Sequence, residues 1–267
     1  MTTKTGQKAL VSQFVSFTGA NEKVASRALK AANWKLDQAC DSYFTSIGSA
    51  APSKGDDSLS KLFEKYREPT DDEGLTTVNG TMRYLADLGI ELENAEILVA
   101  LEIIQAPALG EMSKEHFVEA WKKIGADSIS KQQSYVAGQA KLLSTDMALF
   151  KRVYKHCFIC AKEKSQKALP LENAIVYWEM LFAPPGMRWA TSSTNWIQLW
   201  VEFLTTKWTK SVNKDMWNQT VLFFEKSLQD ETLGFWSEDG AWPGVIDQFV
   251  EYAKKARGEV PDTMETD

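Results

Sequence analysis

The spacing of apolar residues constrains the fold of this chain more than any other feature. After residue 57, apolar side chains recur three or four positions apart almost without interruption, as they do along one face of a helix. No run of alternating polar and apolar residues is bounded by hairpin turns, so the pattern favours helix over sheet. We therefore predict an all-α protein with helices over residues 58–67, 82–88, 95–104, 128–143, 146–164, 171–182, 195–206, 214–227 and 243–257. Ser113 is a further candidate helix N-cap.

A stretch of small and polar residues divides the chain into two parts. Residues 46–57 read Ser-Ile-Gly-Ser-Ala-Ala-Pro-Ser-Lys-Gly-Asp-Asp, which is the composition of a flexible linker. Before it, three short segments with helical spacing (8–16, 22–32 and 34–44) can form only a compact three-helix core. We predict a small module at 7–47, a linker at 48–57, a larger helical domain at 58–258 and a polar tail at 259–267.

Charge and composition exclude several classes of partner. Residues 1–57 carry 7 Lys and Arg against 5 Asp and Glu, whereas the remainder carries 23 against 31. An acidic main body argues against nucleic acid as a partner, because phosphate binding needs positive charge. The N-terminus lacks a secretory apolar stretch, no segment is apolar enough to span a bilayer, and three cysteines cannot form a disulfide framework. We expect a monomer of the cytoplasm and nucleus, without a membrane partner.

One loop resembles a calcium-binding loop. The acidic stretch 67–76 lies between two expected helices and contains Gly74. Calcium loops of this kind need a carboxylate at position 1, Gly at position 6 and a bidentate Glu at position 12. With Gly74 at position 6, Pro69 and Gly80 occupy the two ligand positions. We expect a degenerate EF-hand-like helix-loop-helix unit without calcium.

Neither zinc nor catalysis has adequate residues. Cys157 and Cys160 have CxxC spacing, but zinc needs four ligands, and His156 points about 100° away from Cys157 on a helix. The only other histidine, His116, also falls within a helix among apolar neighbours, and no nucleophile or phosphate-loop motif is present. We therefore expect buried structural thiols, no metal, no cofactor and no catalytic residues.

Two carboxylates in the C-terminal third are harder to interpret. Asp215 opens a helix, where the helix dipole favours an acid. Asp247 lies beyond the first turn if the last helix begins at Pro243, and it shares a more exposed face with Glu251. Chemistry alone favours a solvated helix face for these acids over a binding patch.

Three segments carry a resemblance to a known family. Residues 211–217 (Ser-Val-Asn-Lys-Asp-Met-Trp), 238–253 (Glu-Asp-Gly-Ala-Trp-Pro-Gly-Val-Ile-Asp-Gln-Phe-Val-Glu-Tyr-Ala) and 173–181 (Asn-Ala-Ile-Val-Tyr-Trp-Glu-Met-Leu) resemble the defective-in-cullin-neddylation family. The resemblance covers about residues 58–257, the potentiating-neddylation domain. Residues 17–20 and 33–39 are similar to a ubiquitin-associated (UBA) domain. This layout is that of the short fungal and animal members.

The resemblance implies three binding sites. Family members bind the winged-helix end of a cullin through an Asp-Ala-Asp patch, matched here by Asp215, Ala241 and Asp247. They hold the N-acetylated N-terminal methionine of the neddylation E2 in an apolar pocket, matched by Val78, Ile97, Leu98, Met112, Phe158, Tyr177 and Met180. Each of these seven also has a plain core interpretation. The N-terminal module implies ubiquitin binding through Phe17, Thr18, Gly19 and Ala20.

The function that the resemblance implies is that of a scaffold-type E3 or co-E3. It would promote transfer of the ubiquitin-like modifier from its E2 to a cullin lysine by holding both proteins on one helical body. The thioester cysteine would belong to the E2, which agrees with the missing nucleophile. The alternative is a ubiquitin-receptor adaptor that has no direct role in cullin modification.

Overall fold

The computed structural model describes residues 4–18, 22–48 and 54–258, which form two compact units, Met1–Lys54 and Gly55–Asp267. Residues 49–53 of the predicted linker and the predicted tail at 259–267 lie outside the described residues. No helix in the described ranges is long and apolar enough to cross a membrane.

The N-terminal unit is a three-helix module. Helices α1 (Lys4–Thr18), α2 (Glu22–Ala31) and α3 (Leu36–Gly48) all pack against one another. Their small core is built from Phe14, Ala25, Leu29 and Ala39, with the ring of Tyr43 edge-on to Phe14 at a centroid distance of 5.3 Å. The prediction of a three-helix module is confirmed.

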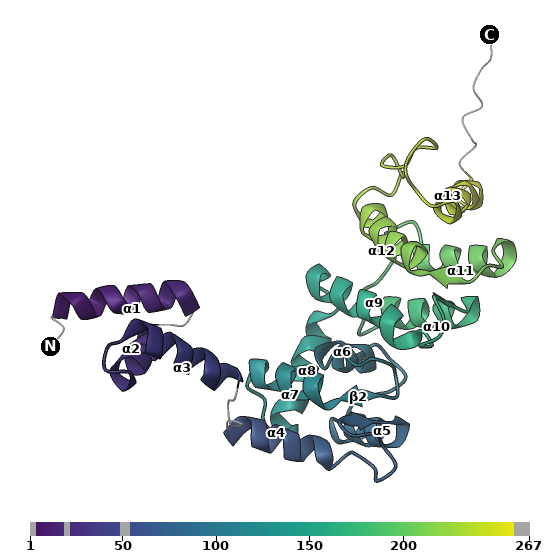
Figure 1. Ribbon diagram of the computed structural model, residues 1–267. Coiled ribbons are helices and arrows are strands. Elements are labelled where there is room, and N and C mark those ends of the chain that lie inside the picture. Colours follow the sequence, from purple (N-terminus) through teal and green to yellow (C-terminus); the bar gives the residue numbers. More distant parts are fainter. Residues whose placement is uncertain (1–3, 19–21, 49–53, 259–267) are drawn as a thin grey trace. The chain divides into compact units, whose positions relative to one another are not determined.

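The larger unit is also helical, as predicted (Figure 1). Its helices are α4 (Lys54–Glu64), α5 (Val78–Asp87), α6 (Glu96–Ile103), α7 (Lys114–Ile124), α8 (Ile129–Leu142), α9 (Met147–Ala161), α10 (Leu171–Phe182), α11 (Trp196–Lys207), α12 (Lys214–Gln229) and α13 (Gly244–Ala256). The bounds of α10 are those predicted, whereas α9 ends three residues before the predicted limit. Ser113 precedes α7 as predicted, but its side chain accepts no capping hydrogen bond.

Four two-residue strands join the helices in pairs. β1 (Leu75–Thr76) lies antiparallel to β2 (Met112–Ser113), and β3 (Ala168–Leu169) lies antiparallel to β4 (Val212–Asn213). Each strand lies between two consecutive helices, so each ladder connects two helix-strand-helix units. These short strands do not alter the all-α class that the sequence predicts, and two residues are too few to display an alternating pattern.

Helix α9 connects the two parts of the larger unit. It packs against α6 on one side and against α10 and α12 on the other (Figure 1). At this junction the ring of Tyr154 stacks on Trp217 at 4.6 Å, and Trp217 stacks on Trp178 at 5.1 Å. The Tyr154 hydroxyl donates to the Trp217 carbonyl over 2.9 Å and accepts from Trp178 Nε1 over 2.7 Å. Aromatic packing and a fully paired hydroxyl therefore fix three helices together.

Candidate functional site

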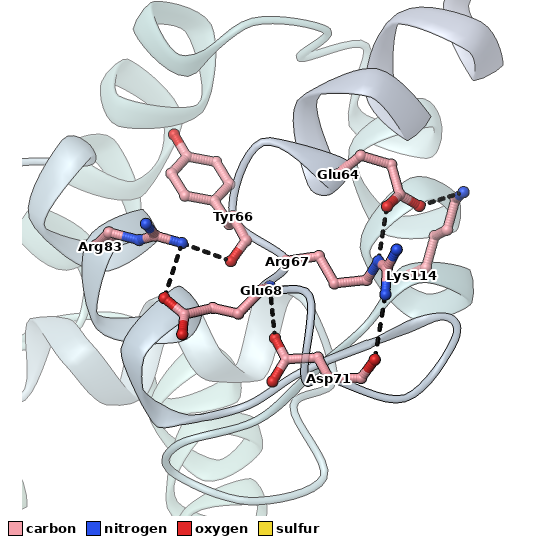
Figure 2. A network of polar contacts seen from close by, with 7 residues as sticks. All are labelled: Glu64, Tyr66, Arg67, Glu68, Asp71, Arg83 and Lys114. Carbon is pink, nitrogen blue, oxygen red and sulfur yellow. Dashed lines mark hydrogen bonds and ion pairs between the residues drawn. The ribbon is translucent and has the colours of Figure 1, made fainter.

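Side chains hold the calcium-like loop between α4 and α5 (Figure 2). Arg67 donates from Nε to Glu64 over 2.8 Å and from its terminal nitrogen to the Asp71 carbonyl over 3.1 Å. The Asp71 carboxylate accepts from the Thr77 hydroxyl over 2.6 Å and from the Glu68 N–H over 2.8 Å, and these bonds lower the pKa of Asp71. Among the described residues, no group of three or more His, Cys, Asp or Glu could hold a metal ion.

The two thiols of the CxxC segment are buried in α9, as the structural interpretation predicts. Burial raises the pKa of Cys157 well above its usual value and that of Cys160 to about 12, so neither thiol is a reactive thiolate near neutral pH. Cys160 Sγ lies 3.3 Å from His156 Nδ1 and 3.2 Å from the Ala106 carbonyl. Burial also lowers the pKa of His156 to about 4.

The second histidine lies at the surface of the larger unit. His116 lies in α7 but is exposed, with Nδ1 3.2 Å from the Gln105 carbonyl. It lines a surface hollow of about 670 Å³ that charged side chains such as Glu102 and Arg152 border. Apolar side chains such as Ile103 and Ile124 line the same hollow, and Phe117 and Trp121 of α7 are buried.

Asp215 lies at the N-terminal end of α12. The Asn213 side chain caps this helix by accepting a hydrogen bond from the Met216 N–H over 2.8 Å. Asp215 therefore has no capping role. Asp215 is exposed, and it forms no ion pair with any cation of the described residues. The Asp215 carboxylate is therefore accessible to a basic side chain of a partner.

Asp247 lies in the first turn of α13, which corrects the sequence-based placement. The helix begins at Gly244 after the N-cap Pro243, so the dipole favours this acid after all. Asp247 is half-buried, and its Oδ1 accepts a hydrogen bond from Trp236 Nε1 over 3.0 Å. It also forms no ion pair within the described ranges.

Ala241 is exposed in the segment that joins α12 to α13. It follows a tight turn in which the Gly240 N–H bonds to the Ser237 carbonyl over 2.9 Å. A Cβ at Gly240 would lie only 2.8 Å from that carbonyl, so a larger residue would displace the turn. The glycine therefore places Ala241 at the surface, immediately before α13.

The starts of α12 and α13 border a common surface hollow of about 380 Å³. Asp215 and Met216 line it from α12, and Gly244 and Gln248 line it from α13. Asp247 is the chain neighbour of Gln248, although it does not line the hollow itself. The first turn of α13, which contains Asp247, therefore lies beside the hollow that Asp215 lines. Lys210 lies in the same hollow, so this surface is not uniformly acidic.

The seven residues expected to bind the E2 are mostly core residues. Ile97, Leu98, Met112 and Phe158 are buried in one hydrophobic cluster, and Tyr177 and Met180 pack against it half-buried. Val78, at the start of α5, is 59% exposed. Six of the seven therefore belong to the core of the larger unit or pack against it, and Tyr177 and Met180 have surface available to a ligand.

The candidate ubiquitin-binding residues are partly described. Phe17, near the end of α1, is 69% exposed, which is unusual for a large aromatic residue. Thr18 is half-buried and donates from its hydroxyl to the Phe14 carbonyl over 2.7 Å. Gly19 and Ala20 lie outside the described residues.

Sequence reasoning missed Trp236, which contacts one of the candidate carboxylates. It lies in an irregular segment, where helical spacing gives no information. The available signal was the aromatic pair Phe235-Trp236 between the two helices. Sequence reasoning also missed the contact of His156 with Cys160, although their separation of four residues places both on one helical face.

Two family models match the chain. One, described as cullin binding, matches residues 131–252, which include Asp215, Ala241 and Asp247. The other, described as a UBA-like domain, matches residues 8–48 and so corresponds to the N-terminal unit.

Relatives match over almost the whole chain. A protein of Pyricularia oryzae named "Defective in cullin neddylation protein 1" is 41% identical over 98% of this chain and 98% of its own length. Proteins with the same name from Yarrowia lipolytica and Caenorhabditis elegans are each 31% identical, over 92% and 94% of this chain and 96% and 91% of their own lengths. The chain therefore belongs to the defective in cullin neddylation family.

Proposed function

We propose that this protein promotes cullin neddylation as a scaffold, by binding a cullin and the neddylation E2 at the same time. The observation that carries the proposal is the pair of Asp215 and Asp247, two carboxylates at the starts of adjoining helices that form no ion pair with any described residue. Both lie in the segment that the cullin-binding family model matches. Charges that a fold leaves unpaired are suited to basic side chains of a partner.

The cullin surface is proposed to be Asp215, Ala241 and Asp247. The two carboxylates bind basic side chains of the cullin winged-helix end, and the small Ala241 permits close approach. Opposite charges at a contact raise the rate of association and determine which partners fit. The excess of acidic over basic residues in 58–267 also favours association with a basic partner.

The E2 is proposed to bind through the expected apolar residues, of which Val78, Tyr177 and Met180 retain exposed surface. An acetylated N-terminal methionine has no charge, so an apolar site can bury it without a desolvated ammonium group. Held beside the cullin, the E2 reaches an effective concentration of order mM. Its own cysteine carries the modifier, so this chain needs no catalytic residue.

Charge reversal tests the proposal. We expect Asp215→Arg and Asp247→Arg each to weaken binding to a cullin winged-helix domain at least about 30-fold, since each places like charges in contact. The rate of cullin neddylation should fall with the binding. Glu93→Arg, an equal charge change at an exposed acid outside the matched segment, is the control and should bind normally. Unchanged cullin binding by both Asp variants would overturn the scaffold proposal.

A ubiquitin-receptor role is the second candidate, supported by the UBA-like match and by the exposed ring of Phe17. Phe17→Ala removes apolar contact area and should weaken ubiquitin binding without changing cullin neddylation. A variant that loses both activities would instead support a function in which ubiquitin recognition directs cullin modification.

A further inference from the structure

The segment that carries Ala241 is fixed by side chains on both of its flanks. Residues 230–243 join α12 to α13 without a helix or strand. Near the start, Asp230 Oδ1 accepts from the Thr232 N–H over 3.0 Å. Further along, the rings of Phe235 and Trp242 lie 6.0 Å apart, and Phe235 packs on Phe223 of α12 at 5.5 Å. These contacts hold the segment in place, together with its side chains that contact α13.

One of these groups is the indole of Trp236, which donates from Nε1 to Asp247 Oδ1 over 3.0 Å. Trp236 is half-buried, so water could also satisfy this donor. By contrast, the indole N–H groups of the buried Trp196 and Trp200 have no acceptor within the described residues. Since these two indoles pack without an acceptor, the fold does not require the bond from Trp236 to Asp247.

A neutral donor orients a carboxylate without neutralising it. The indole bond occupies Oδ1, and Oδ2 accepts no hydrogen bond from any described residue. A lysine also contacts this indole: Lys254 Nζ lies 5.0 Å from the centre of the Trp236 ring, in the range of a cation–π interaction. The same indole thus fixes one oxygen of Asp247 and holds a lysine against its ring face.

We propose that Trp236 is a positioning residue for partner binding: it orients the Asp247 carboxylate so that Oδ2 faces a basic side chain of the cullin. This inference rests on the proposed function, because it assumes that Asp247 contacts the cullin. Trp236 itself acts through Asp247 and need not touch the partner. A carboxylate free to rotate would have to be ordered on binding, which costs affinity.

Removal of the N–H group tests this role. Trp236→Phe keeps an aromatic ring but has no donor, and we expect roughly tenfold weaker binding of the cullin winged-helix domain, the scale of a hydrogen bond to a charged group. A second variant carries benzothienylalanine at position 236, in which sulfur replaces the N–H and the ring shape is kept. It should show the same loss even if Trp236→Phe packs poorly.

A double-mutant cycle separates positioning from general stability. In an Asp247→Ala background, loss of the indole N–H should weaken binding less than twofold further, because its target is gone. In an Asp215→Ala background it should still cost roughly tenfold, since Trp236 has no contact with Asp215. Equal losses in both backgrounds, or normal binding by both 236 variants, would overturn the positioning role.

If Asp247 does not bind the cullin, the variants give a different result from the one expected if only the role of Trp236 is wrong. If the cullin does not contact Asp247, then Asp247→Ala and Asp247→Arg bind like the unmodified protein. If Asp247 variants lose binding while the benzothienylalanine protein retains it, only the role of Trp236 is wrong. Binding of the E2 N-terminal peptide by each variant confirms that the larger unit is folded.

Discussion

At the scale of single residues, His156 carries an electrostatic cost that depends on pH. Its ring is buried in α9 beside Cys160 and the Ala106 carbonyl, and burial lowers its pKa from 6.5 to about 4. The folded protein therefore resists protonation of this ring, whereas the unfolded chain accepts the proton near pH 6.5. Stability from the neutral ring is fully present above pH 6.5 and is lost as the pH falls towards 4.

His156→Gln tests this residue. We expect the unmodified protein to lose about 2 kcal/mol more than this variant between pH 7 and pH 5, because only the histidine takes up a proton on unfolding in that range. Urea denaturation at the two pH values measures the difference. His116→Gln, at the exposed histidine, is the matched control. An equal pH dependence for His156→Gln and the unmodified protein would show that His156 does not titrate in this way.

At the scale of elements, Tyr154 joins α9 to α10 and α12 through one hydroxyl. Tyr154→Phe leaves the Trp178 N–H without its acceptor and the Trp217 carbonyl without this donor, both in a buried site. The carbonyl keeps its intrahelical bond within α12, so the unsatisfied group is the Trp178 N–H, and we expect the free energy of unfolding to fall by about 1–3 kcal/mol. Chemical denaturation measures it.

The control for the junction is Tyr252→Phe. Its hydroxyl makes only a long 3.5 Å contact with an exposed Glu202, so its loss should change stability by no more than about 0.5 kcal/mol. If both variants are equally stable, the hydroxyl of Tyr154 does not contribute to holding the three helices together.

Helices were the elements that the sequence predicted best, for a physical reason. The span Leu171–Phe182 follows Pro170, and its apolar spacing is local information, so both bounds agree with the structure. The β1–β2 and β3–β4 ladders depend on pairing between residues more than 35 positions apart, as with Leu75 and Ser113. Two-residue strands have no periodicity that could indicate such a pairing.

The candidate site was only partly predictable. Asp215, Ala241 and Asp247 were identified by resemblance, because the local chemistry of the two acids alone favours a solvated helix face. That the starts of α12 and α13 border one hollow depends on the tertiary fold. The contact of Trp236 with Asp247 joins residues 11 positions apart, one in an irregular segment and one in α13, so no periodic pattern contains it. The start of α13 at Gly244 rather than Pro243 also changed the interpretation of Asp247.

At the scale of the whole molecule, the chain consists of two units with separate cores. The N-terminal core centres on Phe14 and Leu29, and the larger core extends from Leu59 to Ala253 without sharing a residue with it. The two units also differ in charge, since the first 57 residues are slightly basic and the rest is acidic. Separate cores let one unit change without unfolding the other.

Deletion of residues 1–53 tests this independence. Because the larger core is complete within residues 54–258, we expect the fragment to unfold at the same temperature as the larger unit in the full chain. If the scaffold proposal holds, cullin neddylation should stay within about twofold, because both partner surfaces are retained, whereas ubiquitin binding should be lost. Calorimetry and neddylation rates measure the two outcomes. A stable fragment with strongly reduced neddylation would mean that the N-terminal unit takes part in the transfer itself.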